Sequence, residues 1–205
     1  MSSQILLPGF EPEPTLTDRL FFAVMPDAAA REGIGGALAD LRAAHGLQAR
    51  PVTADRLHVT MGMVGDFPGI PGNLLARASH AAQEAVCEVA PFTASFDTAL
   101  TFTSRSRATG RRPLVLSGGD GVAGLHALYR ALSLAMRKAG LPAYPGSFTP
   151  HLTLMYDEHT VPEQSVSPVA WTVSELVLLH SRIGQNLPYA VLGRWPLRLK
   201  TDSAA

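Results

Sequence analysis

The sequence predicts an α+β fold of antiparallel sheets backed by helices. Two observations indicate this fold. Segments that alternate apolar and polar residues outnumber continuous apolar runs, which is typical of antiparallel sheets with one solvated face. A short pattern, His-x-Thr within an apolar run, also occurs twice, at residues 58–60 and 151–153. The repeat indicates an old duplication and predicts a pseudo-two-fold relation between the halves.

Composition limits the class of protein. The chain has 205 residues, of which 46% are hydrophobic, and its 17 basic and 17 acidic residues cancel. This length suits one domain with a sizeable core, and neutrality argues against bulk electrostatic binding of nucleic acid or anionic membranes. The single cysteine, Cys87, excludes an intrachain disulfide and fits a reducing compartment. With no signal peptide or apolar stretch of membrane-spanning length, we expect a cytoplasmic monomer without a membrane partner.

The first half of the chain contains three elements defined by local patterns. After an irregular, proline-rich lead-in over residues 1–18, an apolar run of strand length spans 19–25. Asp27 is a suitable N-cap for an Ala-rich helix that extends to about residue 44. The first His-x-Thr strand follows, and a Gly-Ile-Pro-Gly turn then opens a second Ala-rich helix at roughly 73–89.

The second half is richer in strands. Alternation over 92–102 predicts a half-solvated strand, and the remaining elements follow in order: a polar loop at 103–112, a short strand at 113–117, a helix at 121–139 ended by Gly140, the second His-x-Thr strand, a loop through Pro162 and Pro168, and strands at 171–181 and 189–199. We therefore expect a single bilobal domain over residues 19–200 and a short tail at 201–205.

The two His-x-Thr patterns predict a shared site. Side chains alternate between the faces of an extended strand, so His58 and Thr60 point one way and Val59 points the other. The same alternation sets His151 and Thr153 on one face of the second strand. Two such strands can line the two walls of a cleft. The alternative is that both histidines are half-buried strand residues bonded to backbone carbonyls.

Two imidazoles in one cleft suit general acid–base catalysis. Because the ordinary pKa of histidine is near 6.5, one ring can accept a proton from water while the other donates one to a leaving oxygen. In-line cleavage of a phosphate ester needs this arrangement. The hydroxyls of Thr60 and Thr153 would hold the non-bridging phosphoryl oxygens. We expect no cofactor and no metal ion to be required.

Other chemistries have weaker support in the sequence. Asp157 and His159 lie near His151, but no His/Glu spacing matches a metal-binding motif. The chain has neither a Gly-x-Ser-x-Gly elbow nor a Walker A loop. The Gly-rich turn at residues 118–121 precedes a helix and can cradle a phosphate in principle, but its flanking spacing fits no nucleotide motif and favours a plain loop.

Several segments resemble the two-histidine phosphoesterases, and among them the RNA 2′,3′-cyclic phosphodiesterases, also called the 2′-5′ RNA ligase family. The segments are Arg-Leu-Phe-Phe-Ala-Val at 19–24, His-Val-Thr at 58–60, Pro-His-Leu-Thr-Leu at 150–154, Val-Leu-Leu-His-Ser at 177–181 and Leu-Gly-Arg-Trp-Pro-Leu at 192–197. The resemblance implies a bilobal α+β fold, in which two antiparallel sheets surround a central cleft and each lobe contributes one His-x-Thr motif. It also implies that His58 is the general acid and His151 the general base.

One position departs from the family pattern. RNA-directed members often carry arginine three residues after the second motif's threonine, where this chain has Tyr156. Tyr156 and Phe148 are candidates to stack on a base or to pack in the core. Arg182, which shares a strand face with His180, is a candidate either to bind phosphate or to face solvent. The loop arginines, which could replace the missing one or simply be solvated, are Arg105, Arg107, Arg111 and Arg112.

The resemblance predicts an RNA-processing phosphodiesterase. It would open the 2′,3′-cyclic phosphate of an RNA end or a nucleotide to a 2′-phosphomonoester, and 2′-5′ ligation is the same chemistry in reverse. Two alternatives stay open at this point. One is a module that binds RNA or a nucleotide without turnover, and the other is a phosphodiesterase acting on a small ADP-ribose-type cyclic phosphate.

Overall fold

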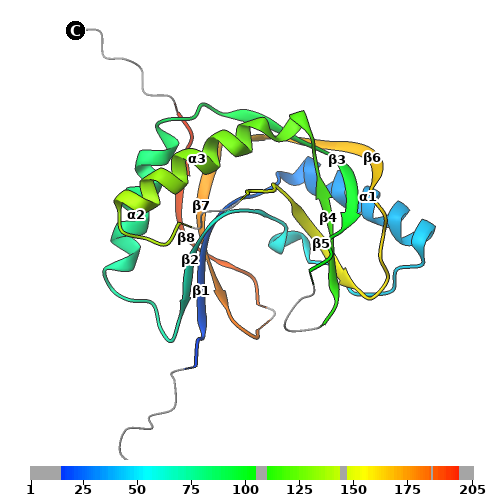
Figure 1. The fold of residues 1–205 in the computed structure, drawn as a ribbon, viewed down its shortest axis with the longest axis horizontal. Helices are drawn as coiled ribbons and strands as arrows, with labels where there is room; N and C mark the ends of the chain where they lie inside the picture. The colour runs from blue at the N-terminus through cyan, green and yellow to red at the C-terminus, as the bar shows by residue number, and fades with distance from the viewer. Residues whose placement is uncertain (1–14, 105–109, 144–146, 186, 199–205) are drawn as a thin grey trace, which may run out of the picture.

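In the described part of the chain, eight antiparallel strands form one continuous sheet in the order β6-β3-β4-β5-β2-β1-β7-β8 (Figure 1). The computed structural model describes residues 15–104, 110–143, 147–185 and 187–198. The strands are β1 (Asp18–Val24), β2 (Val59–Phe67), β3 (Phe92–Thr101), β4 (Arg112–Ser117), β5 (Leu152–Asp157), β6 (Gln164–Val173), β7 (Glu175–Arg182) and β8 (Ala190–Pro196). The helices are α1 (Ala28–His45), α2 (Leu74–Val86) and α3 (Ala123–Lys138), with short 3-10 turns at Ala54–Arg56 and Asp120–Val122.

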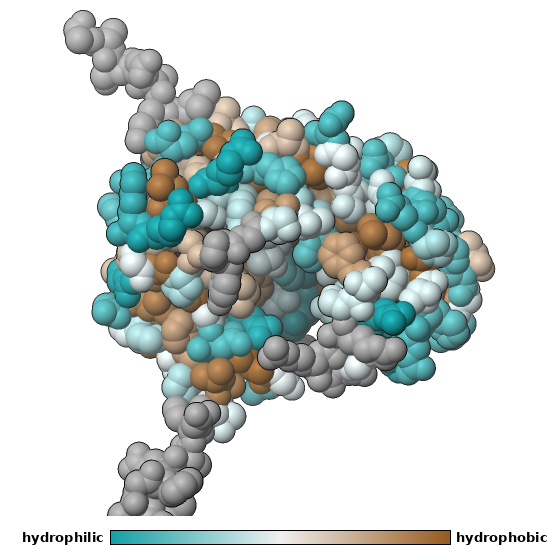
Figure 2. All heavy atoms as spheres, viewed as in Figure 1, coloured by the Kyte–Doolittle hydropathy of each residue, from teal (hydrophilic) through white to brown (hydrophobic). Residues whose placement is uncertain are grey.

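The sheet consists of two four-stranded halves that meet at β2 and β5. Across this junction a single residue pair, Val59 with Leu152, is in register. The α+β prediction is confirmed, but the two separate sheets that we expected are joined by this pair into one. The halves then diverge, and the surface is hollowed where they meet (Figure 2).

Helices cover both halves of the sheet. Helices α2 and α3 pack against each other and cover the half that contains β1, β2, β7 and β8, whereas α1 packs against β6 of the other half (Figure 1). Helix α1 begins as predicted, because the Asp27 carboxylate accepts a hydrogen bond from the Ala30 N–H at 2.8 Å. Gly46, at φ 63°, ends it in the left-handed conformation. None of the described helices is long and apolar enough to cross a bilayer.

Strand β1 illustrates how alternation sets the two faces of the sheet. Leu20, Phe22 and Val24 are fully buried in the main core beneath the helices. Phe21 and Ala23 point to the opposite face, where they form a smaller apolar cluster with Val177 and Leu179 of β7. This smaller cluster is the floor of one half of the hollow.

The prediction of a loop through Pro168 was wrong. Pro168 lies within β6, and the strand predicted at 171–181 is the end of β6 followed by β7. Proline lacks an N–H to donate, but among the described strands β6 is an edge strand whose one partner is β3, so Pro168 breaks no ladder on the outer side. The lead-in up to residue 14 and the tail at 201–205 lie outside the described residues.

Candidate active site

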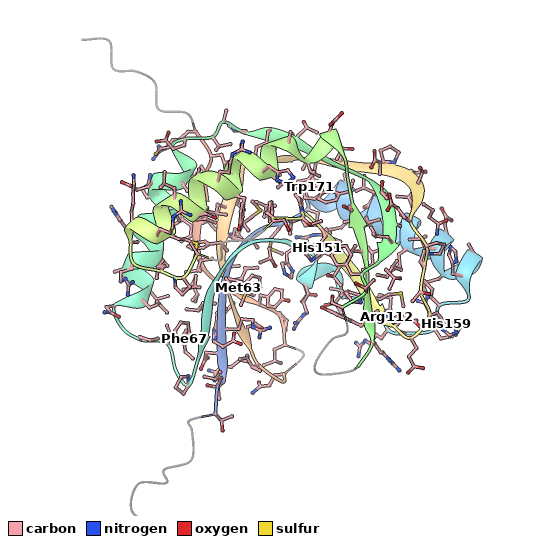
Figure 3. The ribbon with its side chains drawn as sticks, in the orientation of Figure 1. Met63, Phe67, Arg112, His151, His159 and Trp171 are labelled. Atoms are coloured by element: carbon pink, nitrogen blue, oxygen red, sulfur yellow. The ribbon has the colours of Figure 1, made fainter. Side chains whose placement is uncertain are left out.

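His58 and His151 line one cavity of about 320 Å³ at the junction of the two halves. Figure 3 shows His151 and Met63 toward the middle of the molecule, where the halves meet. We call this cavity the catalytic cleft; it is lined by Arg19, Phe21, Val52, Arg56, His58, Thr60, Met63, His151, Thr153, Tyr156, Ser181 and Tyr189. The structure therefore brings together both histidines, both threonines and Tyr156, as predicted.

The two imidazoles are held in the same way. Nδ1 of His58 lies 2.7 Å from the carbonyl oxygen of Arg56, and Nδ1 of His151 lies 2.8 Å from that of Thr149. A carbonyl oxygen can only accept, so each Nδ1 carries the proton and donates it, which leaves Nε2 for chemistry. The hydrogen bonds to backbone carbonyls that the alternative interpretation expected are therefore present, and they also orient both rings.

A bulge in each motif strand brings a third residue into the cleft. In β2 the register with β1 shifts between Thr60 and Gly62, and in β5 the register with β4 shifts between Thr153 and Met155. In both strands the extra residue directly follows the threonine. The extra residue reverses the alternation, so the third residue after each threonine faces the cleft again. These third residues are Met63 and Tyr156.

His58 lies in a largely apolar environment. Its ring centroid is 5.1 Å from that of Phe21 and 5.3 Å from that of Tyr189. Burial lowers the pKa of His58 below its ordinary value, and the positive charges of Arg56 and His151 act in the same direction, while the hydrogen bond to the Arg56 carbonyl opposes them. These effects therefore favour the neutral form of His58 in the free protein.

Two arginines on the cleft wall were not identified from the sequence. Arg19 makes a bidentate ion pair with Asp66, with both N–O distances 2.7 Å, which lowers the pKa of that carboxyl. The Arg56 guanidinium lies over the Tyr189 ring, 4.4 Å from its centroid, and donates to the Leu187 carbonyl at 2.5 Å. Alternation in the first strand could have indicated Arg19, which shares a face with Phe21. Tyr189 has no comparable local signal.

Arg182 does not line the cleft, so its assignment as a substrate-binding residue is corrected. Alternation along β7 places Ser181 on the cleft wall and sends His180 and Arg182 to the opposite face. There His180 Nε2 lies 2.6 Å from the buried carboxylate of Asp18, and Arg182 Nε lies 3.9 Å from the same oxygen. Hydrogen bonds from Thr17 and His180 lower the pKa of Asp18.

An apolar pocket of about 420 Å³ adjoins the cleft on the side of α3 and shares Thr60, Met63 and His151 with it. Tyr129 and Phe148 are stacked there with centroids 4.2 Å apart, and the Phe102 ring meets His151 edge-on at 5.0 Å. The pocket is lined by Thr60, Met61, Gly62, Met63, Phe102, Tyr129, Ser133, Met136, Pro142, Ala143, Ser147, Phe148, Thr149 and His151. Phe148 thus packs against Tyr129 and also faces an open pocket.

Three further groups of residues were singled out from the sequence, and the structure places them differently. Asp157 and His159 bond to each other at 3.1 Å, and no group of three His, Cys, Asp or Glu side chains among the described residues is arranged to hold a metal ion. Arg105 and Arg107 lie outside the described residues. Of the loop arginines that are described, Arg111 is exposed, and Arg112 has its Nε buried without a partner.

The fold and the paired His-x-Thr motifs define a two-histidine phosphoesterase, and comparison with known proteins gives the family. Residues 25–185 match the model of the 2′-5′ RNA ligase superfamily, so the chain belongs to that superfamily. No protein with a curated description matches the chain significantly.

Three solved structures are similar over nearly their whole length. A phosphoesterase is 26% identical, with a TM-score of 0.67 and coverage of 89% of this chain and 99% of the other. TT0787 of Thermus thermophilus is 25% identical, with a TM-score of 0.67 and coverage of 89% and 100%. LigT of E. coli in its apo form is 25% identical, with a TM-score of 0.63 and coverage of 90% and 99%. LigT has also been crystallised with 3′-AMP, phosphate, NADP+ and ATP.

Proposed function

We propose that this protein is a phosphodiesterase that opens 2′,3′-cyclic phosphates of RNA ends or nucleotides to 2′-phosphomonoesters, using His58 and His151 and no metal ion. One observation carries the proposal. The two imidazoles line the same cleft, each with Nδ1 donated to a backbone carbonyl two residues upstream and Nε2 left for proton transfer. Each ring is accompanied by a threonine from its own strand.

The proposed step moves two protons. His151 Nε2 accepts a proton from water, whose oxygen attacks phosphorus, and the bond from phosphorus to O3′ breaks in line with the attack. His58 Nε2 donates its proton to the departing O3′, and the 2′-phosphate remains. Hydroxyls of Thr60 and Thr153 donate to the non-bridging oxygens. Exchange with solvent then restores both rings. With a ribose 5′-hydroxyl in place of water as the nucleophile, the same groups would form a 2′-5′ bond while O3′ departs.

The low pKa of His58 in the free protein bears on its role as the acid. Burial and the nearby charges keep the ring neutral before substrate binds. A bound phosphate carries negative charge, which favours the imidazolium form and raises the pKa of a neighbouring histidine. Proton uptake by His58 would thus accompany substrate binding. His58 would be charged when a leaving oxygen is present to receive its proton.

The apolar pocket supports a nucleotide as the substrate. Its wall offers the faces and edges of Phe102, Tyr129 and Phe148 together with hydroxyls of Ser133 and Thr149, which is a surface suited to stacking and orienting a base. The pocket begins at His151 and Met63, so a base bound there would stay attached to a ribose in the catalytic cleft. The nucleotides crystallised with LigT agree with this class of ligand.

The experiment is turnover of adenosine 2′,3′-cyclic phosphate in the presence of EDTA, followed by chromatographic separation of the 2′- and 3′-monophosphates. We expect the 2′-phosphate, and we expect it to disappear in the His58→Ala and His151→Ala variants. Binding of the nucleotide without turnover would instead support a non-catalytic binding module. Activity that EDTA abolishes would contradict the two-imidazole mechanism.

A further inference from the structure

A groove rich in arginine adjoins the catalytic cleft on its other side, away from the apolar pocket. The groove has a volume of about 400 Å³ and shares Val52, Arg56 and Tyr156 with the cleft. We call it the basic groove; the further residues that line it include Arg50, Thr53 and Arg111. The apolar pocket, the catalytic cleft and the basic groove therefore adjoin one another in this order, and the two histidines line the cleft in the middle.

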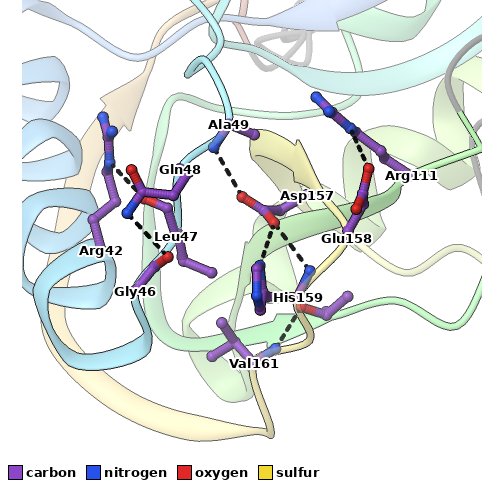
Figure 4. A network of polar contacts seen from close by, with 11 residues as sticks. Arg42, Gly46, Leu47, Gln48, Ala49, Arg111, Asp157, Glu158, His159 and Val161 are labelled. Atoms are coloured by element: carbon purple, nitrogen blue, oxygen red, sulfur yellow. Dashed lines mark hydrogen bonds and ion pairs between the residues drawn. The ribbon is translucent and has the colours of Figure 1, made fainter.

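The wall of the basic groove is fixed by a buried carboxylate. Asp157, at the end of β5, accepts hydrogen bonds from the N–H of Ala49 at 3.0 Å and from the N–H of His159 at 2.9 Å (Figure 4). The Val52 N–H also donates to the Leu154 carbonyl at 2.8 Å. These bonds hold the backbone on both sides of Arg50 against β5, so its guanidinium is presented beside Tyr156 rather than on a free loop.

The charge of the basic groove is only partly compensated. Arg111 pairs with Glu158 at 3.5 Å, with 77% of the Glu158 side chain exposed. Among the described residues, no carboxylate lies within ion-pairing distance of Arg50 or Arg56. In a chain with a formal charge of zero, three guanidinium groups around one groove are a local concentration of positive charge. Guanidinium groups bind phosphate oxygens well because their N–H groups form a planar fork.

The shape of a nucleotide indicates what this groove would bind. In a 2′,3′-cyclic phosphate the phosphorus bridges C2′ and C3′, while C1′ carries the base and C4′ carries the 5′ carbon. The base and the 5′ substituent thus leave the ribose on opposite sides of the reacting phosphate. With the base in the apolar pocket, the 5′ substituent extends toward Arg56 and Tyr156 and into the basic groove.

We propose that the basic groove is a second phosphate subsite, which binds the phosphate immediately 5′ of the reacting nucleotide. This inference rests on the proposed function. It narrows the substrate class to 2′,3′-cyclic phosphates whose ribose carries a 5′-phosphate, as at the 3′ end of an oligoribonucleotide. Nucleoside cyclic phosphates with a free 5′-hydroxyl would be poorer substrates. The exposed side of the groove at Arg50 leaves room for a longer chain to continue into solvent.

The test compares three substrates in EDTA: adenosine 2′,3′-cyclic phosphate, the same compound with a 5′-phosphate, and a short oligoribonucleotide that ends in adenosine 2′,3′-cyclic phosphate. We expect kcat/KM for the two substrates with a 5′-phosphate to exceed that of the 5′-hydroxyl compound by about tenfold or more, the usual effect of a charge-assisted hydrogen bond. An equal gain in kcat/KM for both phosphorylated substrates would show that the groove binds a single phosphate. A larger gain for the oligonucleotide would show that it binds the end of a longer chain.

The matched variants are Arg50→Gln and Arg137→Gln. Each removes one positive charge from an exposed side chain, but Arg137 lies on α3 and lines none of the three compartments. Arg50→Gln should abolish most of the gain from the 5′-phosphate and leave turnover of the 5′-hydroxyl compound within about twofold of wild type, which also shows that the variant is folded. Arg137→Gln should retain the full gain.

Two results would overturn the subsite: equal kcat/KM for the 5′-hydroxyl and 5′-phosphorylated compounds in the wild type, or a gain that persists in both Arg50→Gln and Arg111→Gln. Either result leaves the proposed function intact, because the 5′-hydroxyl compound is still hydrolysed. Failure of all three substrates to react would instead overturn the proposed function itself.

Discussion

Val59 and Leu152 face each other across the junction of β2 and β5, and each directly follows a motif histidine. In an antiparallel pair, the residue before one partner lies opposite the residue after the other. The register of this pair therefore places His58 on the side of Thr153 and His151 on the side of Thr60. The two histidines lie on opposite sides of the pair. One register therefore places the histidines and the threonines of both motifs around this pair.

The first prediction concerns removal of either imidazole. His58→Ala or His151→Ala should each lower kcat on adenosine 2′,3′-cyclic phosphate by a factor on the order of 10²–10⁴, the usual contribution of a general acid or base. The double variant should lose far less than the product of the two factors, because the two groups act as a unit. Steady-state kinetics in EDTA measure all three, with thermal unfolding as the control for folding. A single variant with near-wild-type turnover would refute the assignment.

The second prediction separates the roles of the two histidines. If His58 protonates the departing O3′, a substrate with sulfur in place of O3′ should not need it, because a thiolate leaves without a proton. His58→Ala should therefore recover most of its lost activity on the 3′-thio cyclic phosphate, whereas His151→Ala should stay inactive, since water must still be deprotonated. Recovery in His151→Ala alone would show that the roles are reversed.

The third prediction follows from the charge next to His58. Arg56 lowers the pKa of His58, so Arg56→Gln should raise it toward the ordinary value near 6.5. Titration of the His58 ring by NMR, with His58→Asn to assign its signal, measures the change, and Arg137→Gln is the control for loss of a distant charge. In kcat/KM against pH, the limb that reports His58 should move to higher pH in Arg56→Gln. An unchanged His58 titration would show that the charge of Arg56 does not contribute to the lowered pKa.

Local patterns predicted most of the fold and the centre of the site because both depend on alternation within a strand. They failed where pairing decides the outcome. Pro168 reads as a loop residue, and only its place on an edge strand allows it in β6. Tyr156 faces the cleft because β5 contains a bulge, which no residue of the sequence indicates. Alternation showed that Arg182 shares a face with His180 but left open which face this is, because the face of β7 is set by its pairing with β1.

The last prediction concerns the carboxylate that supports the basic groove. Despite burial, hydrogen bonds from the N–H groups of His159 and Ala49 hold the pKa of Asp157 well below its ordinary value of 3.8. At pH 7 Asp157→Asn should lower the free energy of unfolding by about 1.5–3 kcal/mol, the usual contribution of a hydrogen bond to a charged group.

The sign of the pH dependence follows from the lowered pKa. The contribution of Asp157 is complete above the unfolded-state pKa near 4 and declines as the pH falls below it, because the unfolded chain then binds a proton that the folded chain does not. The difference in unfolding free energy between wild type and Asp157→Asn should therefore be constant from pH 7 to about pH 5 and shrink between pH 4 and pH 2. Urea unfolding at several pH values measures this difference. The control is Glu158→Gln, which changes the exposed carboxylate next to Asp157 in the chain. A difference that does not change with pH would show that the contacts of Asp157 stabilise the fold through packing rather than through its charge.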